Sequence, residues 1–534
     1  MTEAMAATET MEVIEAMAAI AAMGVIEAMA AIAAMAGTNA RGPQRVSPRG
    51  SDLREVSAGA QLAPPRHAGK APGRRLQCAA HHRPTHRRGE PMSTIDALKT
   101  AVQETIDRRG DELIQVAKTI LAHPEPGFRE QKTAQLVARK FREFGIPFTE
   151  GIALTGLKGM LDTGHAGPTV AVMGELDSLK VSEHPHADPV TAAAHACGHH
   201  CQVAMMLAVG LGLKAAEVLP HLSGRIALIA VPAEEYIEIG YRDQLRREGK
   251  IEFLGGKPEF IRLGALDDVD MAMMTHTASQ GADQGKISFG GTNNGIVAKS
   301  IRFIGKAAHA GGAPHTGINA LNAAMIAMSA IHAQRETYHD DDTIRIHPII
   351  TQGGVAVSSV PADVRMETFV RGRSIEAFLN ASEQVDRALR AGAMAVGGRV
   401  DITTLPGYLP LHSDDTMLDL YSANAVALVG AEHVKRLGHR TGSTDMGDVS
   451  QIMPVIHPYV AAATGSGHGS DYIVQDYDLG VLTAAKAMAM TVIDLLTNNA
   501  QHARTVKAQY QAPLNKATYL SLMRSMFQEA SYTE

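Results

Sequence analysis

The sequence predicts an α/β protein with a mixed, mainly parallel sheet covered by helices, and a second, α+β domain inserted into the first. Three observations lead to this prediction. Short apolar runs, TVAVMGEL, RIALIAVPAEE and VDMAMMT, alternate with a helical stretch between residues 169 and 275, as in a parallel sheet. Two strand-and-helix units suited to an antiparallel sheet begin near residue 287. The first kind of pattern returns after about residue 408.

These patterns divide the chain into five segments. The first is a low-complexity, disordered extension, because VIEAMAAIAAMG recurs almost unchanged and a basic, Pro- and Gly-rich stretch follows it. Helical spacing then starts after Met92. We expect the extension at 1–91, the main domain at 92–285 and 408–500, the inserted domain at 286–407 and a C-terminal tail at 501–534.

The overall composition narrows the function classes. Hydrophobic residues make up 45% and charged residues 20% of the chain, which is typical of a soluble globular protein. A net charge of -6 gives no electrostatic footprint for nucleic acid. Glu15 and Glu27 interrupt the apolar N-terminal run, so we expect no membrane anchor. Three cysteines cannot form a disulfide framework, and a reducing, cytoplasmic location is expected.

The stretch HACGHHCQ, residues 195–202, concentrates three histidines and two cysteines. A structural zinc site normally takes four Cys or His ligands in two pairs, and no second Cys-bearing pair exists in this sequence. The structural-zinc and redox interpretations are therefore weakened. Cys197 and His199 lie two residues apart between a polar loop and an apolar helix, where they can bind one metal or two neighbouring metals.

Further candidate ligands lie at the ends of predicted strands. Glu234 and Glu235 follow an apolar strand and a proline. Adjacent side chains on an extended backbone point in opposite directions, so one carboxylate can bind metal while the other handles the proton of a bound water. His276 lies at another strand end and His468 in a Gly-rich loop. Taken alone, either histidine is better explained by a surface or packing role.

Taken in order, these motifs resemble the co-catalytic metal amidohydrolases that include hippurate hydrolase, indole-acetyl-amino-acid hydrolases and aminobenzoyl-glutamate hydrolase. The resemblance covers roughly residues 92–500 and rests on HPEPGFREQKTA, GELDSL with HACGHH, VPAEE, GKAAHAGGAPHTGINAL and GSTDMGDVSQIMP. The last motif is most similar to the aminobenzoyl-glutamate branch. The resemblance implies a metallohydrolase domain on the mainly parallel sheet, with an inserted α+β lid/dimerisation domain.

The resemblance also implies roles for the candidate residues. Glu234 would be the general base, which takes a proton from a metal-activated water and returns it to the leaving amine. The cofactors would be two divalent metal ions, Mn or Zn. Their ligands would be Cys197, as a bridging thiolate, and His199, Glu235, His276 and His468.

Three residues of the inserted domain have implied roles as well. His309 corresponds to a lid histidine that reaches the neighbouring subunit's site and stabilises the developing oxyanion, which requires at least a homodimer. Arg371 or Arg373 would hold a substrate carboxylate, because a guanidinium matches it bidentately. A surface histidine and a solvated strand end are the alternative interpretations.

Some positions depart from the family pattern. His200 stands where the family usually has Asp or Asn, and this change can alter the substrate without removing the metals. We expect Cys201 to be a small buried apolar residue. Glu175 and Asp177 match the acidic loop and are expected to orient metal ligands, whereas His195 is not expected to be a ligand.

The sequence therefore predicts a metal-dependent hydrolase that cleaves a C–N (amide) bond of a small carboxylate-bearing substrate, such as an N-acyl or N-aroyl amino acid. The alternative is hydrolytic deamination of an activated aromatic amine, as in a nitroanthranilate-type aminohydrolase. A non-catalytic binding protein on the same fold is a third hypothesis. It is disfavoured because Glu234 and every implied ligand are present.

Overall fold

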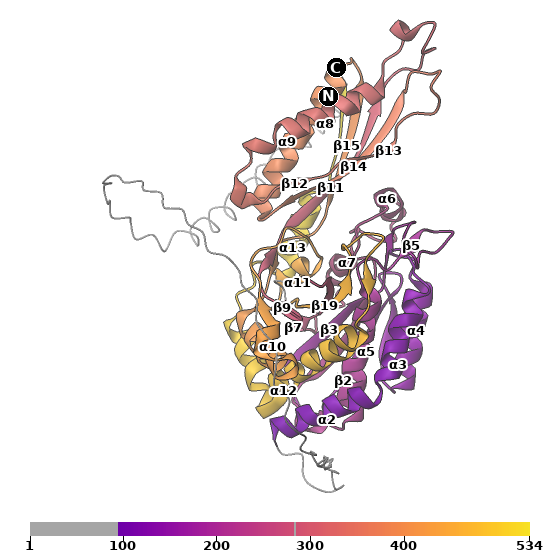
Figure 1. Cartoon of the computed structure of the whole chain (residues 1–534). Helices are drawn as coiled ribbons and strands as arrows, with labels where there is room; N and C mark the ends of the chain where they lie inside the picture. The colour runs from indigo at the N-terminus through magenta and orange to yellow at the C-terminus, as the bar shows by residue number, and fades with distance from the viewer. Residues whose placement is uncertain (1–93, 282–284, 534) are drawn as a thin grey trace, which may run out of the picture. The chain divides into compact units, whose positions relative to one another are not determined.

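The computed structural model describes residues 94–281 and 285–533, so the predicted extension at 1–91 lies outside the described residues. The main domain is built on a six-stranded sheet in the order β1-β2-β6-β3-β7-β18 (Figure 1). Strands β6, β3, β7 and β18 run parallel to one another. Strand β2 is antiparallel to both of its neighbours, β1 and β6. The strands are Phe148–Ile152 (β1), Gly156–Asp162 (β2), Thr169–Glu175 (β3), Arg225–Val231 (β6), Met271–Met273 (β7) and Val455–Ile456 (β18). The predicted mixed, mainly parallel sheet is confirmed.

The central strands are buried on both faces. In β3, Val170 and Val172 belong to one hydrophobic cluster, whereas Ala171 and Met173 belong to another. Successive side chains of a strand point to opposite faces, so a strand covered on both sides is apolar at every position. This explains why the central strands appear in the sequence as unbroken apolar runs.

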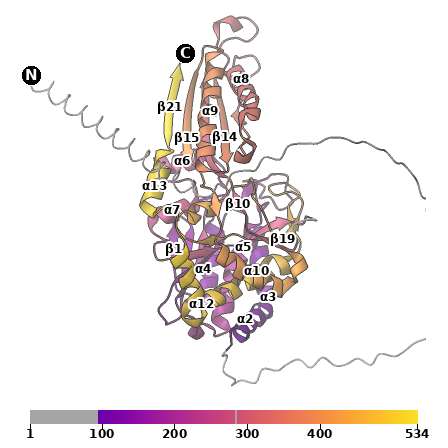
Figure 2. The same cartoon turned by 90° about the vertical axis from the view of Figure 1, so that its left-hand side faces the viewer.

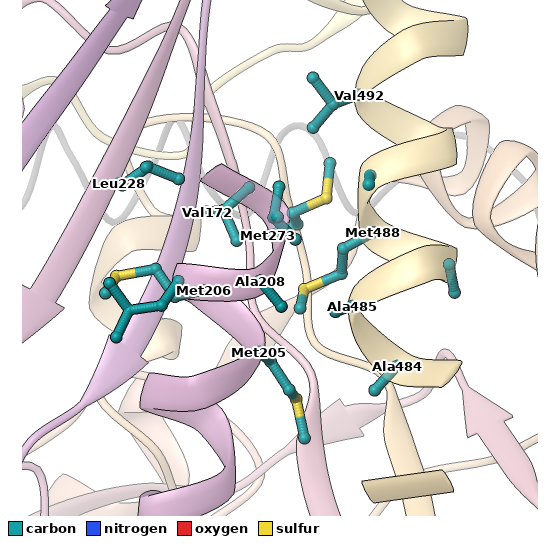
Figure 3. Close-up of a cluster of buried hydrophobic side chains, with 14 of the residues drawn as sticks. Val172, Met205, Met206, Ala208, Leu228, Met273, Ala484, Ala485, Met488 and Val492 are labelled. Atoms are coloured by element: carbon teal, nitrogen blue, oxygen red, sulfur yellow. The ribbon is translucent and has the colours of Figure 1, made fainter. Parts of the chain in front are cut away.

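Helices cover the first face of the sheet. Figure 3 shows Met205, Met206 and Ala208 of one helix meeting Ala484, Ala485 and Met488 of another over Val172, Leu228 and Met273 of the strands. The helices of this layer are Ile95–Arg108 (α2), Gly110–Leu121 (α3), Gln131–Glu143 (α4), His199–Ala215 (α5), Asp415–Val429 (α10) and Ala484–Gln509 (α12). The helical run Asp478–Gln509 is long and apolar enough to cross a membrane, but 83% of its apolar window is buried inside the protein. It is a core helix.

The other face is covered by shorter helices, and a second sheet extends the main domain. The helices are Ile239–Arg247 (α6), Gly256–Leu263 (α7) and Met446–Ser450 (α11). The second sheet contains His276–Ser279 (β8), Ile287–Phe289 (β9), Val434–Arg436 (β17), Tyr459–Thr464 (β19) and Ile473–Val474 (β20). The predicted start of the inserted domain at 286 is too early, because β9 pairs with β17 and β19 of the main domain.

The inserted domain is an antiparallel sheet with two helices packed on it. Its order is β12-β14-β11-β15-β21, and β13 also pairs with β14. The elements are Gly295–Ile304 (β11), Ala320–Ala333 (α8), Arg345–Ile346 (β12), Ile349–Gln352 (β13), Asp363–Gly372 (β14), Ile375–Met394 (α9) and Arg399–Pro406 (β15). This is the predicted pair of strand-and-helix units. Short strands Thr292–Asn293 (β10) and Leu411–His412 (β16) pair where the chain enters and leaves it.

The predicted C-terminal tail at 501–534 is wrong. Helix α12 is kinked at residues 497–500 and resumes to Gln509. Helix α13 (Lys516–Ser525) follows, and strand β21 (Gln528–Thr533) pairs with β15 as an edge of the inserted sheet (Figure 2). Helix α13 has a complete capping box at Asn515 and Thr518. Tyr519 and Met523 are buried at a spacing of four residues, which places both on one face of the helix.

We predict that Met523→Ala lowers the free energy of unfolding by roughly 2–5 kcal/mol, because it leaves a cavity under α13. Chemical denaturation measures this change. Ser521→Ala, at an exposed position of the same helix, is the matched control. Equal stability of the two variants would mean that the segment after residue 510 contributes nothing to the core.

Candidate metal centre

The loop before helix α5 brings Cys197 and His199 together. Gly198, between them, caps α5 with a φ of 93°, in the region that only glycine adopts readily. A Cβ at Gly198 would lie 1.9 Å from Oγ1 of Thr277. That hydroxyl donates to the Cys197 carbonyl at 3.1 Å. Glycine is therefore required here, and the close approach fixes the cysteine against β8.

Two histidines present their Nε2 atoms to the same space. Nδ1 of His199 lies 3.0 Å from the carbonyl oxygen of Asp177, and Nδ1 of His276 contacts the carbonyl of Thr277. A proton on each Nδ1 satisfies these carbonyls and leaves Nε2 free as a ligand. Nε2 of His276 lies 3.3 Å from Sγ of Cys197.

Glu234 and Glu235 do not point in opposite directions, contrary to the prediction. A carboxylate oxygen of each lies 3.8 Å from Nε2 of His199. The reason is that β6 ends at Val231 and Ala233 has a φ of 55°, so the backbone is not extended here. Both carboxylates consequently reach one site.

Buried polar groups hold this turn. Arg242, only 1% exposed, donates to the carbonyls of Ala233 at 2.9 Å and Leu254 at 2.7 Å, and to that of Glu235. Glu130 accepts from the Ala233 N–H at 2.8 Å. A non-glycine residue at positive φ costs on the order of 1–2 kcal/mol. The strain persists because several contacts on both sides of Ala233 determine the turn.

His468 lies at the exposed side of the cluster. Its side chain is 57% exposed, and its Nε2 is 3.6 Å from Oε1 of Glu235. Its backbone N–H donates to the carbonyl of Ala196 at 2.9 Å, which ties its loop to the segment that carries Cys197. Asp177 adds a second link, since its Oδ2 accepts from the Glu235 N–H at 2.9 Å. Asp177 thus orients both His199 and Glu235, the kind of role predicted for it.

The five predicted ligands form two groups that share one atom. Cys197, His199 and His276 make one group, and Cys197, Glu235 and His468 make the other, with the ligand atoms of each group within 4.8 Å of one another. Atoms at 2.0–2.3 Å from one tetrahedral zinc-like ion are roughly 3.3–3.8 Å apart, which lies within this limit. Nε2 of His199 and Oε1 of Glu235 are buried without a hydrogen-bond partner. The residues present therefore fit two divalent cations, and Cys197 would be common to both ligand groups.

The charges of the cluster also suit bound cations. Burial, with the nearby charges of Glu175 and Glu235, holds the pKa of Glu234 well above its usual range. Burial and Glu235 likewise raise the pKa of the Cys197 thiol. Burial and the charge of His199 lower the pKa of His276 to about 4. Burying an ionised acidic group without a compensating positive charge costs free energy. Bound cations would supply that charge and favour the ionised forms.

Glu175, which the sequence predicted only to orient metal ligands, contacts a candidate ligand directly. Its partner Lys257 was not identified from the sequence. Oε2 of Glu175 is 3.1 Å from Nε2 of His199, and Glu175 forms a third candidate group with His199 and Glu234. Lys257, fully buried, contacts Oε1 of Glu175 at 2.6 Å and also Asp445. Although burial opposes it, Lys257 lowers the pKa of Glu175 to about 2. No local sequence signal marks Lys257, because its role depends on tertiary contacts.

The other residues of HACGHHCQ lie outside the ligand groups. His195 and His200 are buried with their rings 5.3 Å apart, and Nε2 of His200 lies 3.4 Å from the Tyr477 hydroxyl. One step along a helix turns a side chain by about 100°, so His200 leaves the face of His199. Cys201 is fully buried in the hydrophobic core, as expected.

The structure separates the two arginine candidates. Arg371, half-buried on β14, has its pKa lowered by burial, and the charges of Glu235 and Glu234 act on it. Arg373 is exposed, and its backbone N–H donates to the carbonyl of Asp342 at 2.9 Å. Of the two side chains, Arg371 is the one shown within electrostatic reach of the carboxylate pair.

His309 lies on the inserted domain, in the loop after β11. It is exposed, and its Nδ1 accepts from the N–H groups of Gly311 at 3.2 Å and Gly312 at 2.9 Å. None of the candidate metal groups found among the described residues contains it. Its action on a neighbouring subunit stays a prediction.

Comparison with known proteins agrees with this geometry. Residues 292–395 match the peptidase dimerisation domain of the M20 peptidases. The chain is 27% identical to a mouse Xaa-Arg dipeptidase (78% of this chain, 92% of the relative) and 28% identical to a p-aminobenzoyl-glutamate hydrolase chain of Escherichia coli (74% and 90%). The chain is therefore similar to metal-dependent peptidases and amidohydrolases of this family, over about three quarters of its length.

The M20 fold is also found in a solved structure. A dinuclear metal binding peptidase of the M20 family from Bacillus subtilis superposes with a TM-score of 0.53 at 21% identity, covering 75% of this chain and 99% of that one. The predicted α/β metallohydrolase fold with an inserted domain is confirmed, and the hydrolases and peptidases among the relatives support an amidohydrolase.

We predict that Gly198→Ala weakens metal binding by roughly ten- to hundredfold, the range seen when groups that orient metal ligands are disturbed. The added methyl displaces Cys197 and His199 from Thr277. Titration of Zn or Mn into the metal-free protein measures the loss. Gly249→Ala is the control, because Gly249 also has a positive φ of 70° but open space around its Cβ position. Equal affinities in the two variants would contradict the role of this contact.

We also predict a pH-dependent stability difference at Glu130. Burial and the charge of Asp177 raise its pKa from 4.5 to about 7. A raised pKa contributes stability that is present below pH 4.5 and lost as pH rises through 7. The unfolding free energy of the wild type, relative to Glu130→Gln, should fall by about 3 kcal/mol between those values and then stay level. Urea denaturation at several pH values measures it, and a constant difference would be inconsistent with the raised pKa.

Proposed function

We propose that this protein is an amidohydrolase that cleaves the amide bond of a small carboxylate-bearing substrate, such as an N-acyl or N-aroyl amino acid. The observation that carries the proposal is the pair of ligand groups sharing Cys197 beside the buried Glu234. The relatives support the substrate class, since one is named for dipeptides and another for p-aminobenzoyl-glutamate, an N-aroyl amino acid.

In this proposal, Cys197 is the shared metal ligand, with His199 and His276 on one side and Glu235 and His468 on the other. A mixed set of sulfur, nitrogen and carboxylate donors suits Zn, and Mn is the second candidate. Two divalent ions, if bound by these residues, would supply Lewis acidity for the activation of water and the polarisation of an amide carbonyl. A reducing cytoplasm would keep Cys197 a free thiol.

Glu234 acts as the general base. Burial, and then the charges of Glu175 and Glu235, raise its pKa in the metal-free protein, and a carboxylate next to a metal-bound water is positioned to accept its proton. It takes a proton from the attacking water and returns it to the leaving amine. The Tyr408 hydroxyl donates to the Glu234 carbonyl and keeps the backbone of the base in place, while Arg371 holds a substrate carboxylate.

The inserted domain completes the site in a homodimer. We propose that His309 of one subunit stabilises the oxyanion in the site of its partner, which its exposed position permits. The same domain exposes Met325 and Ile326 on α8 and Ile349 and Ile350 on β13. Apolar side chains beside an edge strand are typical of an association surface.

The test is Glu234→Gln in the metal-loaded enzyme, assayed with N-acyl amino acids, aroyl-glutamates and aminobenzoates. We expect kcat to fall by a factor on the order of 10²–10⁴ or more, since proton transfer is lost, while metal analysis still finds two ions per chain. Glu248→Gln, on the exposed end of α6, is the control.

Two outcomes would overturn the proposal. Full activity in Glu234→Gln would remove the general base from the mechanism. Release of ammonia from an aminobenzoate, with no amino acid released from any amide, would favour the aromatic deamination that the sequence left open.

A further inference from the structure

Arg440 occupies a fixed position where the chain passes between the two domains. Its backbone N–H donates to the carbonyl of Thr292 at 2.8 Å, and the N–H of Asn294 donates to the carbonyl of Gly442 at 3.0 Å. These bonds hold the Arg440 segment parallel to β10. The side chain therefore projects from a backbone that is restrained on both sides.

The guanidinium of Arg440 borders the metal cluster. Its central carbon lies 4.0 Å from the centre of the Tyr459 ring, a stacked arrangement that orients the planar group. The Tyr459 ring is 5.8 Å from the ring of His276, and its hydroxyl is 3.0 Å from Nδ1 of His457. A single aromatic ring thus separates the guanidinium from one of the proposed ligands.

Arg440 has no anionic partner among the described residues. No carboxylate in the described part of the chain lies within 4.0 Å of its guanidinium nitrogens, and its Nη1 is buried without a hydrogen-bond acceptor. A buried donor left unsatisfied costs roughly 1–3 kcal/mol. Two other arginines make the contrast: Arg242 donates to three carbonyls, and Arg436, four residues before Arg440, pairs with Asp415.

We propose that Arg440 is a specificity-determining residue that binds a carboxylate of the substrate, other than the one held by Arg371. This inference rests on the proposed function and narrows its substrate class. Two separate guanidiniums beside the metal cluster favour an N-acylated acidic amino acid, which carries two carboxylates, over neutral analogues. They disfavour a cationic amino acid such as arginine, because like charges repel.

The test is calorimetric binding of three ligands to metal-loaded Glu234→Gln protein, so that no turnover is required. The ligands are N-benzoyl-glutamate, its side-chain amide and its α-amide. With Arg440 present, amidation of either carboxylate should weaken binding by about ten- to hundredfold, the value of a charge-assisted hydrogen bond. Adding Arg440→Met should abolish one of these two penalties and leave the other, which belongs to Arg371.

Matched variants separate recognition from a packing role. Arg436→Met, in the same segment, should leave both penalties unchanged, and Arg440→Lys, which keeps the charge, should retain part of the lost one. The proposal is overturned if both penalties survive in Arg440→Met, or if that variant weakens all three ligands equally. If Arg440→Met fails to fold, the Arg440→Lys result decides, and unchanged penalties there count against the proposal.

Hydrolysis of the same ligands by protein with Glu234 intact distinguishes a failure of the proposed amidohydrolase function from a failure of substrate recognition by Arg440. Selective binding through Arg440 without amide cleavage would overturn the proposed function but keep the anion site. Cleavage with no difference between the ligands would keep the function and remove Arg440 from substrate recognition.

Discussion

The burial of several carboxylates beside a half-buried thiol, at the edge where adjacent parallel strands end, is the constraint on which the rest of this structure depends. Strands β3 and β6 lead directly into Glu175 and into the turn that carries Glu234 and Glu235. Ligand sites gather at this edge of α/β sheets. Such a cluster is stable only with positive charge nearby, which Lys257 supplies to Glu175 and metal ions suit at Cys197.

Much of the fold, and the residues that make up the candidate metal groups, were predictable from sequence for definite reasons. Strands buried on both faces leave unbroken apolar runs, and Cys197, His199, Glu235, His276 and His468 were identified from motifs in a characteristic order. The structure brings these five ligands together. The side-chain directions at the glutamate pair were mispredicted, because a positive φ at Ala233 reverses a rule that holds only for extended chain. The edge strand β21 was missed because its residues are mostly exposed and lack an apolar face.

Three basic side chains show which features of the site could not be predicted from the sequence. Lys257, Arg242 and Arg440 carry no local motif, and their surroundings differ completely. Lys257 is neutralised by two carboxylates, Arg242 is satisfied by backbone carbonyls, and Arg440 keeps a buried donor without an acceptor. The first two explain how the site is held in shape. Of these three residues, only Arg440 keeps a side-chain donor that a bound substrate can use. We therefore assign Arg440 to substrate binding.

The domain connections also bear on the catalytic residues. Strand β15 leaves the inserted domain at Pro406, whose carbonyl accepts from the Tyr236 hydroxyl at 2.8 Å. Two residues later, Tyr408 donates to the Glu234 carbonyl. The rings of Tyr236 and Tyr408 are 5.4 Å apart and nearly perpendicular, a favourable aromatic geometry. The proposed base is thus bonded to the segment by which the inserted domain, which carries Arg371 on β14, rejoins the main domain. One hydroxyl, that of Tyr408, therefore links that segment directly to the backbone of Glu234.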